Sequence, residues 1–231
     1  MGQTLLDGEH LLTEARNARA EFKLLIFAEA DNQDAKWTQA LPDVPVVTLP
    51  INLFRALSPV VSPTGVMAVI DIPLPLAKRA VDFTMLVETV QDPGNLGAML
   101  RNAAAAGVEA VYLSPGCAEA WSPKALRGGQ GAQFHLDIHV DADLAEVARG
   151  FPGQVYAAVP HAQVSLYDLK LTGQVALAFG NEGAGLGERV LGVARPFSIP
   201  MPGQTESLNV AAATAVCLFE RVRQQTSAHR V

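Results

Sequence analysis

Three short polar segments hold the side chains of this chain that could do chemistry. They read DPGNLGAMLR at residues 92–101, FGNEGAGL at 179–186 and IPMPGQTESLN at 199–209. Each segment follows an apolar, strand-like run, and ligands of open α/β sheets collect outside the carboxyl ends of the strands. We therefore expect the three segments to form one composite binding site.

The first segment combines turn residues with one positive charge. Its Asp-Pro-Gly-Asn start is good turn chemistry on its own, so a plain turn before a helix is one explanation. Arg101 is the only charged residue between Asp92 and Glu109, in an alanine-rich stretch. Because a guanidinium is normally solvated or paired, this arginine indicates either an exposed helix face or a phosphate or carboxylate partner.

Glycines dominate the second segment. Gly180, Gly183 and Gly185 follow a compact apolar run, and glycine lets a backbone approach a ligand closely. Glu182 lies among them, where a carboxylate is either solvated or in contact with that ligand. The spacing is not GxGxxG, because Glu188 occupies the final glycine position, and the sequence contains no GxxxxGKS or GxxxxGKT. Dinucleotide and P-loop sites are therefore unsupported.

The third segment joins a proline-rich stretch to a helix start. Met201 lies between two prolines, which favours an extended backbone whose polar groups can bind a ligand. Thr205 and Ser207 are candidate N-caps for a final helix. Asn209 would then lie in the first turn of that helix, where asparagine is a mediocre residue, so a binding role is the alternative.

Metal and nucleophile chemistry have no support in the sequence. The histidines show neither HExxH nor paired ligand spacing, and the two cysteines, Cys117 and Cys217, lie far apart without a CxxC. The GxSxG elbow of serine hydrolases is also missing. We expect no metal site, and two reduced thiols are typical of a cytoplasmic protein.

Composition bounds the class of protein. The chain has 231 residues, of which 49% are hydrophobic, so a sizeable core is available. Its formal net charge of −6 opposes phosphate-dominated binding unless a local basic face exists. The longest apolar stretch, residues 210–219, is too short to span a bilayer, and the first residues lack the pattern of a secretory signal. We therefore expect no membrane association.

Alternating helical and strand-like patterns position these segments. In the first part we predict helices over 9–19, 32–40 and 51–57, the last with Leu53, Phe54 and Leu57 on one face, and strands over 22–28, 44–48 and 65–70. Pro73 and Pro75 then mark a domain boundary near 72–80, which divides the chain into domains 1–78 and 79–231.

The second part repeats strand and helix patterns. We predict strands over 83–90, 110–113, 155–159 and 175–179, an alternating stretch over 134–140, and helices over 96–106, from 122–123 onward, over 141–148 and over 207–223. Repeated βα units predict a parallel sheet with helices on both faces. The apolar start of the last helix, residues 208–219, offers more apolar surface than one core-facing stripe needs, which predicts a dimer interface.

The three segments resemble the three motifs of the SpoU family of RNA 2′-O-ribose methyltransferases, which belongs to the SPOUT class. Residues 92–107, 180–186 and 199–211 correspond to the motifs in order, and residues 127–132 resemble the segment between the first two. The likeness covers about residues 81–224. Residues 1–72 are similar, through 8–10 and 57–66, to the small L30e-like domain that often precedes the catalytic domain.

The resemblance implies a fold, a cofactor and partners. The α/β parallel sheet would end in a C-terminal trefoil knot, follow a small L30e-like α/β domain and form a homodimer. The loops of the knot would hold S-adenosylmethionine, and the chain would methylate a ribose 2′-OH in structured RNA, either rRNA or tRNA. Methyl transfer from a sulfonium needs alignment of the nucleophilic oxygen and no metal.

The resemblance also assigns residues. It places Asn95, Arg101, Glu182, Ser207 and Asn209 at catalytic positions, and Gly180, Gly183, Ile199, Met201 and Leu208 at the cofactor. Arg101 is either the base or, because arginine barely deprotonates, an anchor for the RNA phosphate. Two alternatives are an RNA-binding module without activity and an enzyme that methylates a base nitrogen. The intact catalytic set opposes the first, and Ser-Leu-Asn in the third motif favours ribose.

Overall fold

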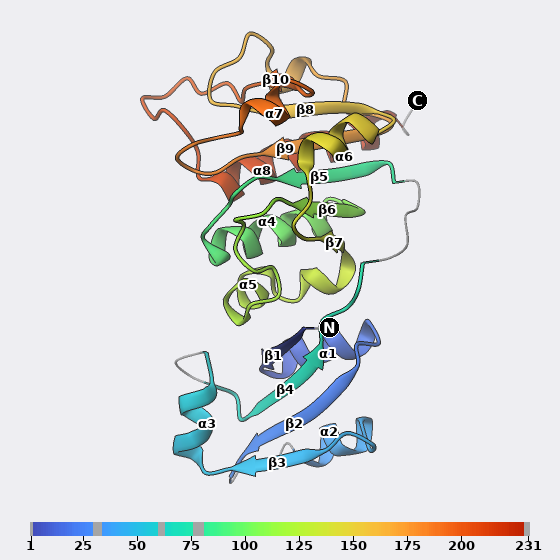
Figure 1. Ribbon diagram of the computed structural model, residues 1–231, viewed down its shortest axis with the longest axis vertical. Helices are drawn as coiled ribbons and strands as arrows, with labels where there is room; N and C mark the ends of the chain where they lie inside the picture. Colours follow the sequence, from blue (N-terminus) through green and yellow to red (C-terminus); the bar gives the residue numbers. More distant parts are fainter. Residues whose placement is uncertain (1, 30–33, 60–62, 76–80, 229–231) are drawn as a thin grey trace.

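The computed structural model describes residues 2–29, 34–59, 63–75 and 81–228, which form two β-sheets (Figure 1). The first sheet has four strands in the order β1-β4-β2-β3, with β2 parallel to β3 and the other neighbours antiparallel. Its strands are β1 (Gln3–Asp7), β2 (Phe22–Ala28), β3 (Val46–Leu49) and β4 (Val66–Asp71), accompanied by α1 (Glu9–Asn17), α2 (Asp34–Ala40) and α3 (Ile51–Leu57). Residues 32 and 33 of the helix predicted over 32–40 lie outside the described ranges.

The second sheet has six strands in the order β10-β8-β9-β5-β6-β7, and every neighbouring pair is parallel. Its strands are β5 (Phe83–Val87), β6 (Ala110–Leu113), β7 (Asp137–His139), β8 (Gln154–Ala158), β9 (Val175–Phe179) and β10 (Arg195–Phe197). The connecting helices are α4 (Pro93–Ala105), α5 (Pro123–Gly129), α6 (Leu144–Gly150), α7 (Glu188–Leu191) and α8 (Val210–Ala228), with 3-10 turns η1 (Ala132–His135) and η2 (Leu166–Asp168).

Helices cover both faces of this parallel sheet, as the sequence predicts. Met85 of β5 lies in an apolar cluster with residues of α4 and α8, whereas its neighbour Leu86 lies in a second cluster with residues of α6 and α7. Successive side chains of a strand point to opposite faces, so the two clusters mark the two faces of the sheet. The expectation of an α/β fold with a covered parallel sheet is confirmed.

Helix α4 begins about one turn before its predicted start. The Asp92 side chain accepts a hydrogen bond of 2.8 Å from the backbone N–H of Asn95, and Pro93 occupies the first helical position. An acidic N-cap followed by proline is a strong helix start. The helix ends at Ala105, one residue before the predicted end, and Gly107 follows with a φ of 77°, in the left-handed region that favours glycine.

The start of α8 corrects the prediction. The helix begins at Val210, and the side-chain oxygen of Asn209 accepts hydrogen bonds from Ala211 (2.9 Å) and Ala212 (3.3 Å). Asn209 is therefore the N-cap itself, and the expectation that Thr205 or Ser207 caps the helix is wrong. Asparagine disfavours helix interiors but is among the best N-caps, so its poor helix propensity marked the boundary of the helix.

Several other boundaries differ. Residues 3–7 form β1, which the sequence analysis did not predict, and the strand predicted over 83–90 ends at Val87. Thr89 has a left-handed φ of 52°, which cannot continue a strand. Residues 134–140 divide between η1 and β7. In α3, Phe54 is fully buried, but Leu53 and Leu57 are 51% and 55% exposed, so only Phe54 of the predicted apolar face enters the core.

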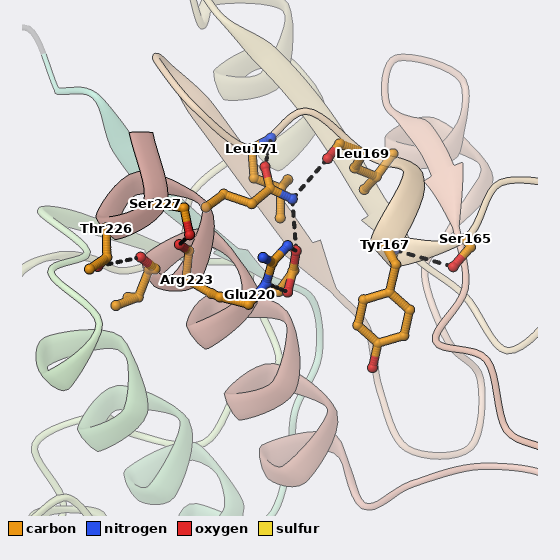
Figure 2. Close-up of polar contacts among 10 residues, drawn as sticks. Ser165, Tyr167, Leu169, Leu171, Glu220, Arg223, Thr226 and Ser227 are labelled. Carbon is orange, nitrogen blue, oxygen red and sulfur yellow. Dashed lines mark hydrogen bonds and ion pairs between the residues drawn. The ribbon is translucent and has the colours of Figure 1, made fainter. Parts of the chain in front are cut away.

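Side chains near the end of α8 tie this helix to the segment before β9. The buried Arg221 guanidinium donates to the carbonyls of Leu171 (2.8 Å) and Gly173 (3.0 Å). Gln224 donates to the Leu169 carbonyl at 3.0 Å and accepts from the Leu171 N–H at 2.9 Å. Figure 2 shows Glu220 and Arg223 near Leu169 and Leu171, and an ion pair of 2.7 Å joins the first two residues. These contacts anchor the helix whose other end carries Asn209.

The first sheet meets the helical layer of the second sheet at α5 and at the segments on either side of α5. The hydroxyl of Thr4 donates to the Trp121 carbonyl at 2.6 Å, and both groups are buried. The Nε2 of His135 lies 2.8 Å from a carboxylate oxygen of Glu14 in α1, within hydrogen-bond distance. One apolar cluster also includes residues of both sheets, such as Leu6 and Phe83. The first sheet is thereby packed against the parallel sheet's helical layer.

Gly97 allows α4 and α5 to pack closely. A Cβ at this position would lie 2.4 Å from the Ala125 carbonyl oxygen and 2.8 Å from the Gly129 nitrogen. We expect Gly97→Ala to lower the free energy of unfolding by roughly 2 kcal/mol or more, because backbone atoms cannot give way as side chains do. The reverse change at an exposed position of the same helix, Ala105→Gly, should cost only about 1 kcal/mol through helix propensity. Urea unfolding of both variants measures the difference, and equal losses would contradict this account.

Candidate active site

The three polar segments meet at the carboxyl edge of the parallel sheet. The first follows β5, the second follows β9, which pairs with β5, and the third follows β10. Because the strands are parallel, their carboxyl ends lie along the same edge. The sequence prediction that these segments adjoin one another agrees with this geometry.

A chain of hydrogen bonds joins one side chain from each segment. The Nδ2 of Asn209 donates to the Oδ1 of Asn95 at 3.0 Å. The Nδ2 of Asn95 in turn donates to the carboxylate of Glu182 at 2.7 Å. Hydrogen bonds to an ionised carboxylate are stronger than bonds between neutral groups. The structure therefore brings together three of the five residues expected at catalytic positions.

A pocket of ≈ 230 Å³ opens beside this chain of hydrogen bonds. Its walls come from the end of β8, the loop after β9, the segment after β10 and the first turn of α8. All five residues expected at the cofactor line it, together with Glu182 and Ser207. These five residues are Gly180, Gly183, Ile199, Met201 and Leu208.

The walls of this pocket combine apolar side chains with unpaired backbone groups. Val210 and Ala213 of α8 contribute apolar surface on one side. Within the described residues, the backbone N–H and C=O groups of Ile199, Met201 and Leu208 make no hydrogen bond. Backbone groups of a loop need partners, and here a ligand or water must supply them. The pocket therefore suits a ligand that has a flat apolar body and polar edges.

Gly180 has a structural purpose that the sequence did not reveal. A Cβ at Gly180 would lie 2.2 Å from the carbonyl carbon of Gly185, so glycine here lets the loop fold back on itself. The turn is closed by two backbone hydrogen bonds between Asn181 and Gly185, of 3.1 and 2.9 Å. This close turn alone requires glycine at position 180, which also lines the pocket. A Cβ at Gly183 would meet only the Asn181 side chain, at 3.5 Å.

Arg101 is not part of this cluster. It lies on α4 outside the pocket, is exposed, and makes no hydrogen bond or ion pair with any residue in the described ranges. Ser207 lines the pocket and is likewise exposed, with no hydrogen bond to the described part of the chain. Both side chains are available to a bound molecule.

Several lining residues escaped the sequence analysis. Ala158, Val159 and Pro160 at the end of β8 form one wall, but ordinary apolar residues at a strand end carry no signal of function. Asn181 was also missed. Its side chain accepts from the N–H groups of Gly183 (2.8 Å) and Ala184 (3.0 Å). An asparagine among glycines is the usual signal for such a turn, and it would have identified this residue.

The start of α4 carries a fixed negative charge near the site. The backbone N–H of Asn95 and the ammonium of Lys124, 3.1 Å away, hold the pKa of Asp92 below its ordinary value. Within the described ranges, no group of three or more histidine, cysteine or acidic side chains could hold a metal ion. Across those same ranges, no helix combines the length and apolar character that crossing a membrane requires.

Comparisons with known proteins agree with this geometry. The profile of the SpoU rRNA Methylase family matches residues 82–219. A tRNA/rRNA methyltransferase of Synechocystis, itself uncharacterized, is 33% identical over 98% of this chain and 86% of its own length. The 23S rRNA (guanosine(2553)-2′-O)-methyltransferase RlmP of Bacillus subtilis is 31% identical over 93% of this chain and 86% of its own length.

A solved structure extends the likeness to three dimensions. The SpoU methyltransferase AviRb of Streptomyces viridochromogenes, crystallised with its cofactor AdoMet, is similar with a TM-score of 0.84 and 26% identity. The alignment covers 98% of this chain and 92% of that protein. These findings agree with one another: the profile match, the relatives that align over most of the chain and the shared architecture. This chain belongs to the SpoU rRNA Methylase family.

Proposed function

We propose that this protein transfers a methyl group from S-adenosylmethionine to a ribose 2′-OH of RNA. The observation that carries the proposal is the meeting of three separate segments at one pocket, with Asn209, Asn95 and Glu182 hydrogen-bonded beside it. Relatives that match nearly the whole chain are named as RNA methyltransferases. An enzyme is therefore preferred to a binding module without activity.

The pocket fits the cofactor on its own chemistry. Adenosine has a flat apolar base with donors and acceptors on its edge, and the unpaired backbone groups of Ile199, Met201 and Leu208 offer the complementary partners. Apolar Val210 and Ala213 suit the faces of the base. When bound, S-adenosylmethionine supplies the methyl group from its positively charged sulfonium.

The side chains beside the pocket divide the remaining work. Asn95 uses its Oδ1 and one Nδ2 hydrogen within the protein, so its second Nδ2 hydrogen remains for a ribose oxygen. Ser207 offers a hydroxyl at the pocket itself. A guanidinium is a poor base and a good partner for phosphate, so we assign Arg101 to the phosphate beside the target ribose rather than to proton removal.

Ribosomal RNA is the substrate class that we favour over transfer RNA. The relative from Bacillus subtilis is named for a guanosine of 23S rRNA, and AviRb belongs to the same family. Methylation of a base nitrogen is less well supported, because the relatives whose names give the modified atom specify the ribose 2′-oxygen. We propose a cytoplasmic location, which the likeness to a bacterial rRNA methyltransferase supports.

The finer architecture forms part of the same proposal. We assign residues 1–78 to an L30e-like RNA-binding domain and residues 79–231 to the catalytic domain, which is supported by the two separate sheets. The boundary residues 76–80 lie outside the described ranges. A trefoil knot in the catalytic domain is supported by the position of the pocket between the loop after β9 and the segment after β10.

Cofactor binding and product mapping test this function. Calorimetry should detect S-adenosylmethionine binding that EDTA leaves unchanged, because the pocket is built from backbone and apolar groups. The 2′-O-methyl sites of rRNA and tRNA should then be mapped in cells with and without the protein, and one rRNA ribose should lose its methyl group. Binding that disappears in EDTA, or identical maps, would contradict the proposal.

A homodimer is proposed with α8 at its interface. The sequence prediction counted Val210 and Cys217 as part of that surface, but both are buried in the chain's own core. Leu208 and Phe219 remain 42% and 46% exposed. Light scattering should give twice the mass of the chain, and Phe219→Glu should shift the protein toward the monomer. A monomeric parent protein at micromolar concentration would refute this interface.

A further inference from the structure

The side chain of Asn181 links two strands at the site. Its Nδ2 donates to the carbonyl of Thr89, after β5, at 2.8 Å. Its Oδ1 accepts from the N–H groups of Gly183 (2.8 Å) and Ala184 (3.0 Å) within its own loop. All three bonds form on a half-buried side chain at the wall of the cofactor pocket. The amide thus ties the loop after β9 to the turn after β5.

Thr89 is held in an unfavourable conformation at the point where Asn181 binds it. Its φ of 52° is a left-handed value, which is rare for a β-branched residue. Its N–H donates to the hydroxyl of Ser114, after β6, at 3.0 Å. The Thr89 peptide is therefore fixed on one side by β6 and on the other by the loop after β9. Strained backbone that surrounding groups hold in place is a frequent feature of functional sites.

Glu182 is the residue that this arrangement positions. It follows Asn181 directly, is exposed, and accepts its hydrogen bond from Asn95 at 2.7 Å. A second contact holds the far end of the same loop, where the Gly187 N–H donates to the Glu88 carboxylate at 2.7 Å. The bonds that hold this loop therefore set the position from which the Glu182 carboxylate reaches Asn95.

We propose that Asn181 is a positioning residue for the methyl-transfer site, acting through Glu182 on Asn95. The inference rests on the proposed function. An asparagine that only shaped a local turn would need no more than the two bonds that its Oδ1 accepts within the same loop. The bond from Nδ2 to Thr89 is different, because it crosses to another strand and sets the loop relative to α4, where Asn95 lies. Asn181 does not itself touch the reacting atoms in this account.

The substitution Asn181→Asp separates the two uses of the side chain. A carboxylate keeps the acceptor for Gly183 and Ala184 but places a negative oxygen against the Thr89 carbonyl. We expect the rate of single-turnover methyl transfer at saturating S-adenosylmethionine to fall about tenfold or more. Residues that share one hydrogen-bond network typically show coupling of this size. In a Glu182→Ala background the same substitution should change the rate less than about twofold, because the residue through which it acts is gone.

Asn102→Asp is the matched control. The Nδ2 of Asn102 donates to the Ala211 carbonyl at 3.0 Å, so the control loses an equivalent bond between α4 and α8. Its effect on the rate should be the same with and without Glu182. If Asn181→Asp also lowers the rate by the same factor with and without Glu182, Asn181 is only a structural residue and the proposal fails.

A spectroscopic measurement covers the case in which the Glu182→Ala protein turns over too slowly to compare. The side-chain amide resonance of Asn95 in an NMR spectrum reports its bond to Glu182. That resonance should move in the same direction in Asn181→Asp and in Glu182→Ala, and stay in place in Asn102→Asp. An unmoved Asn95 amide in Asn181→Asp would overturn the inference. Failure of the proposed function itself would be recognised separately, because the parent protein would then bind no S-adenosylmethionine and methylate no RNA.

Discussion

Replacing Arg101 by alanine should slow single-turnover methyl transfer to RNA by about a hundredfold or more, the usual cost of removing one charged contact to a transition state. The affinity for S-adenosylmethionine should stay within about twofold, because Arg101 lies outside the pocket. The reason is the exposed guanidinium on α4, which makes no hydrogen bond or ion pair with the described residues and is therefore available to an RNA phosphate.

Two further variants separate this role from a general effect of charge. Arg101→Lys should rescue poorly, because an ammonium cannot make the two parallel bonds of a guanidinium. Arg149→Ala removes another exposed arginine, on α6 at the opposite face of the sheet, and should leave methyl transfer unchanged. Near-normal turnover of Arg101→Ala would show that Arg101 is only a solvated helix residue.

Substituting Gly180 by alanine should weaken S-adenosylmethionine binding by roughly tenfold to a hundredfold, the equivalent of the 1–3 kcal/mol that overpacking costs. The new methyl group would lie 2.2 Å from the Gly185 carbonyl carbon and 2.4 Å from the Leu186 nitrogen. Both are backbone atoms, so the loop that forms the pocket wall must open. Calorimetry measures the affinity, and thermal unfolding shows whether the rest of the fold is retained.

The same change at other glycines provides the controls. Gly183→Ala alters the same loop but meets only the Asn181 side chain, at 3.5 Å, so it should weaken binding much less. Gly150→Ala at the end of α6 meets nothing within 4 Å and should leave binding unchanged. Unchanged affinity in Gly180→Ala, with a folded protein, would mean that closure of this loop on itself does not shape the cofactor site.

Local patterns predicted the parallel sheet well, because the information lay in short stretches. The strands over 110–113 and 175–179 are uniformly apolar, and the structure reproduces both ranges. Boundaries set by a single backbone conformation were harder. Nothing in the residue type of Thr89 announces a left-handed φ, so the end of β5 could not be placed from propensity. The strand β1 pairs with β4, far along the chain, and its sequence alone did not identify it.

The site was predictable as a set of segments but not as a set of contacts. Glycine, proline and asparagine marked the loops after β5, β9 and β10, and parallel strands bring such loops to one edge. The hydrogen bond between Asn209 and Asn95 depends on where α8 begins, which was predicted wrongly. Arg101 lies outside the pocket because of its place on α4. Neither the residue type nor its spacing from Asn95 could reveal this place.

Several of the polar groups that the pocket offers to a ligand belong to the main chain, and this has a consequence for inhibition. The N–H and C=O groups of Ile199, Met201 and Leu208, which have no partner among the described residues, are present whatever side chains these positions carry. An inhibitor that bonds to them could not be evaded by exchanging one side chain for another. Resistance would have to arise through changes of loop shape, and such changes would also damage the enzyme's hold on its own cofactor.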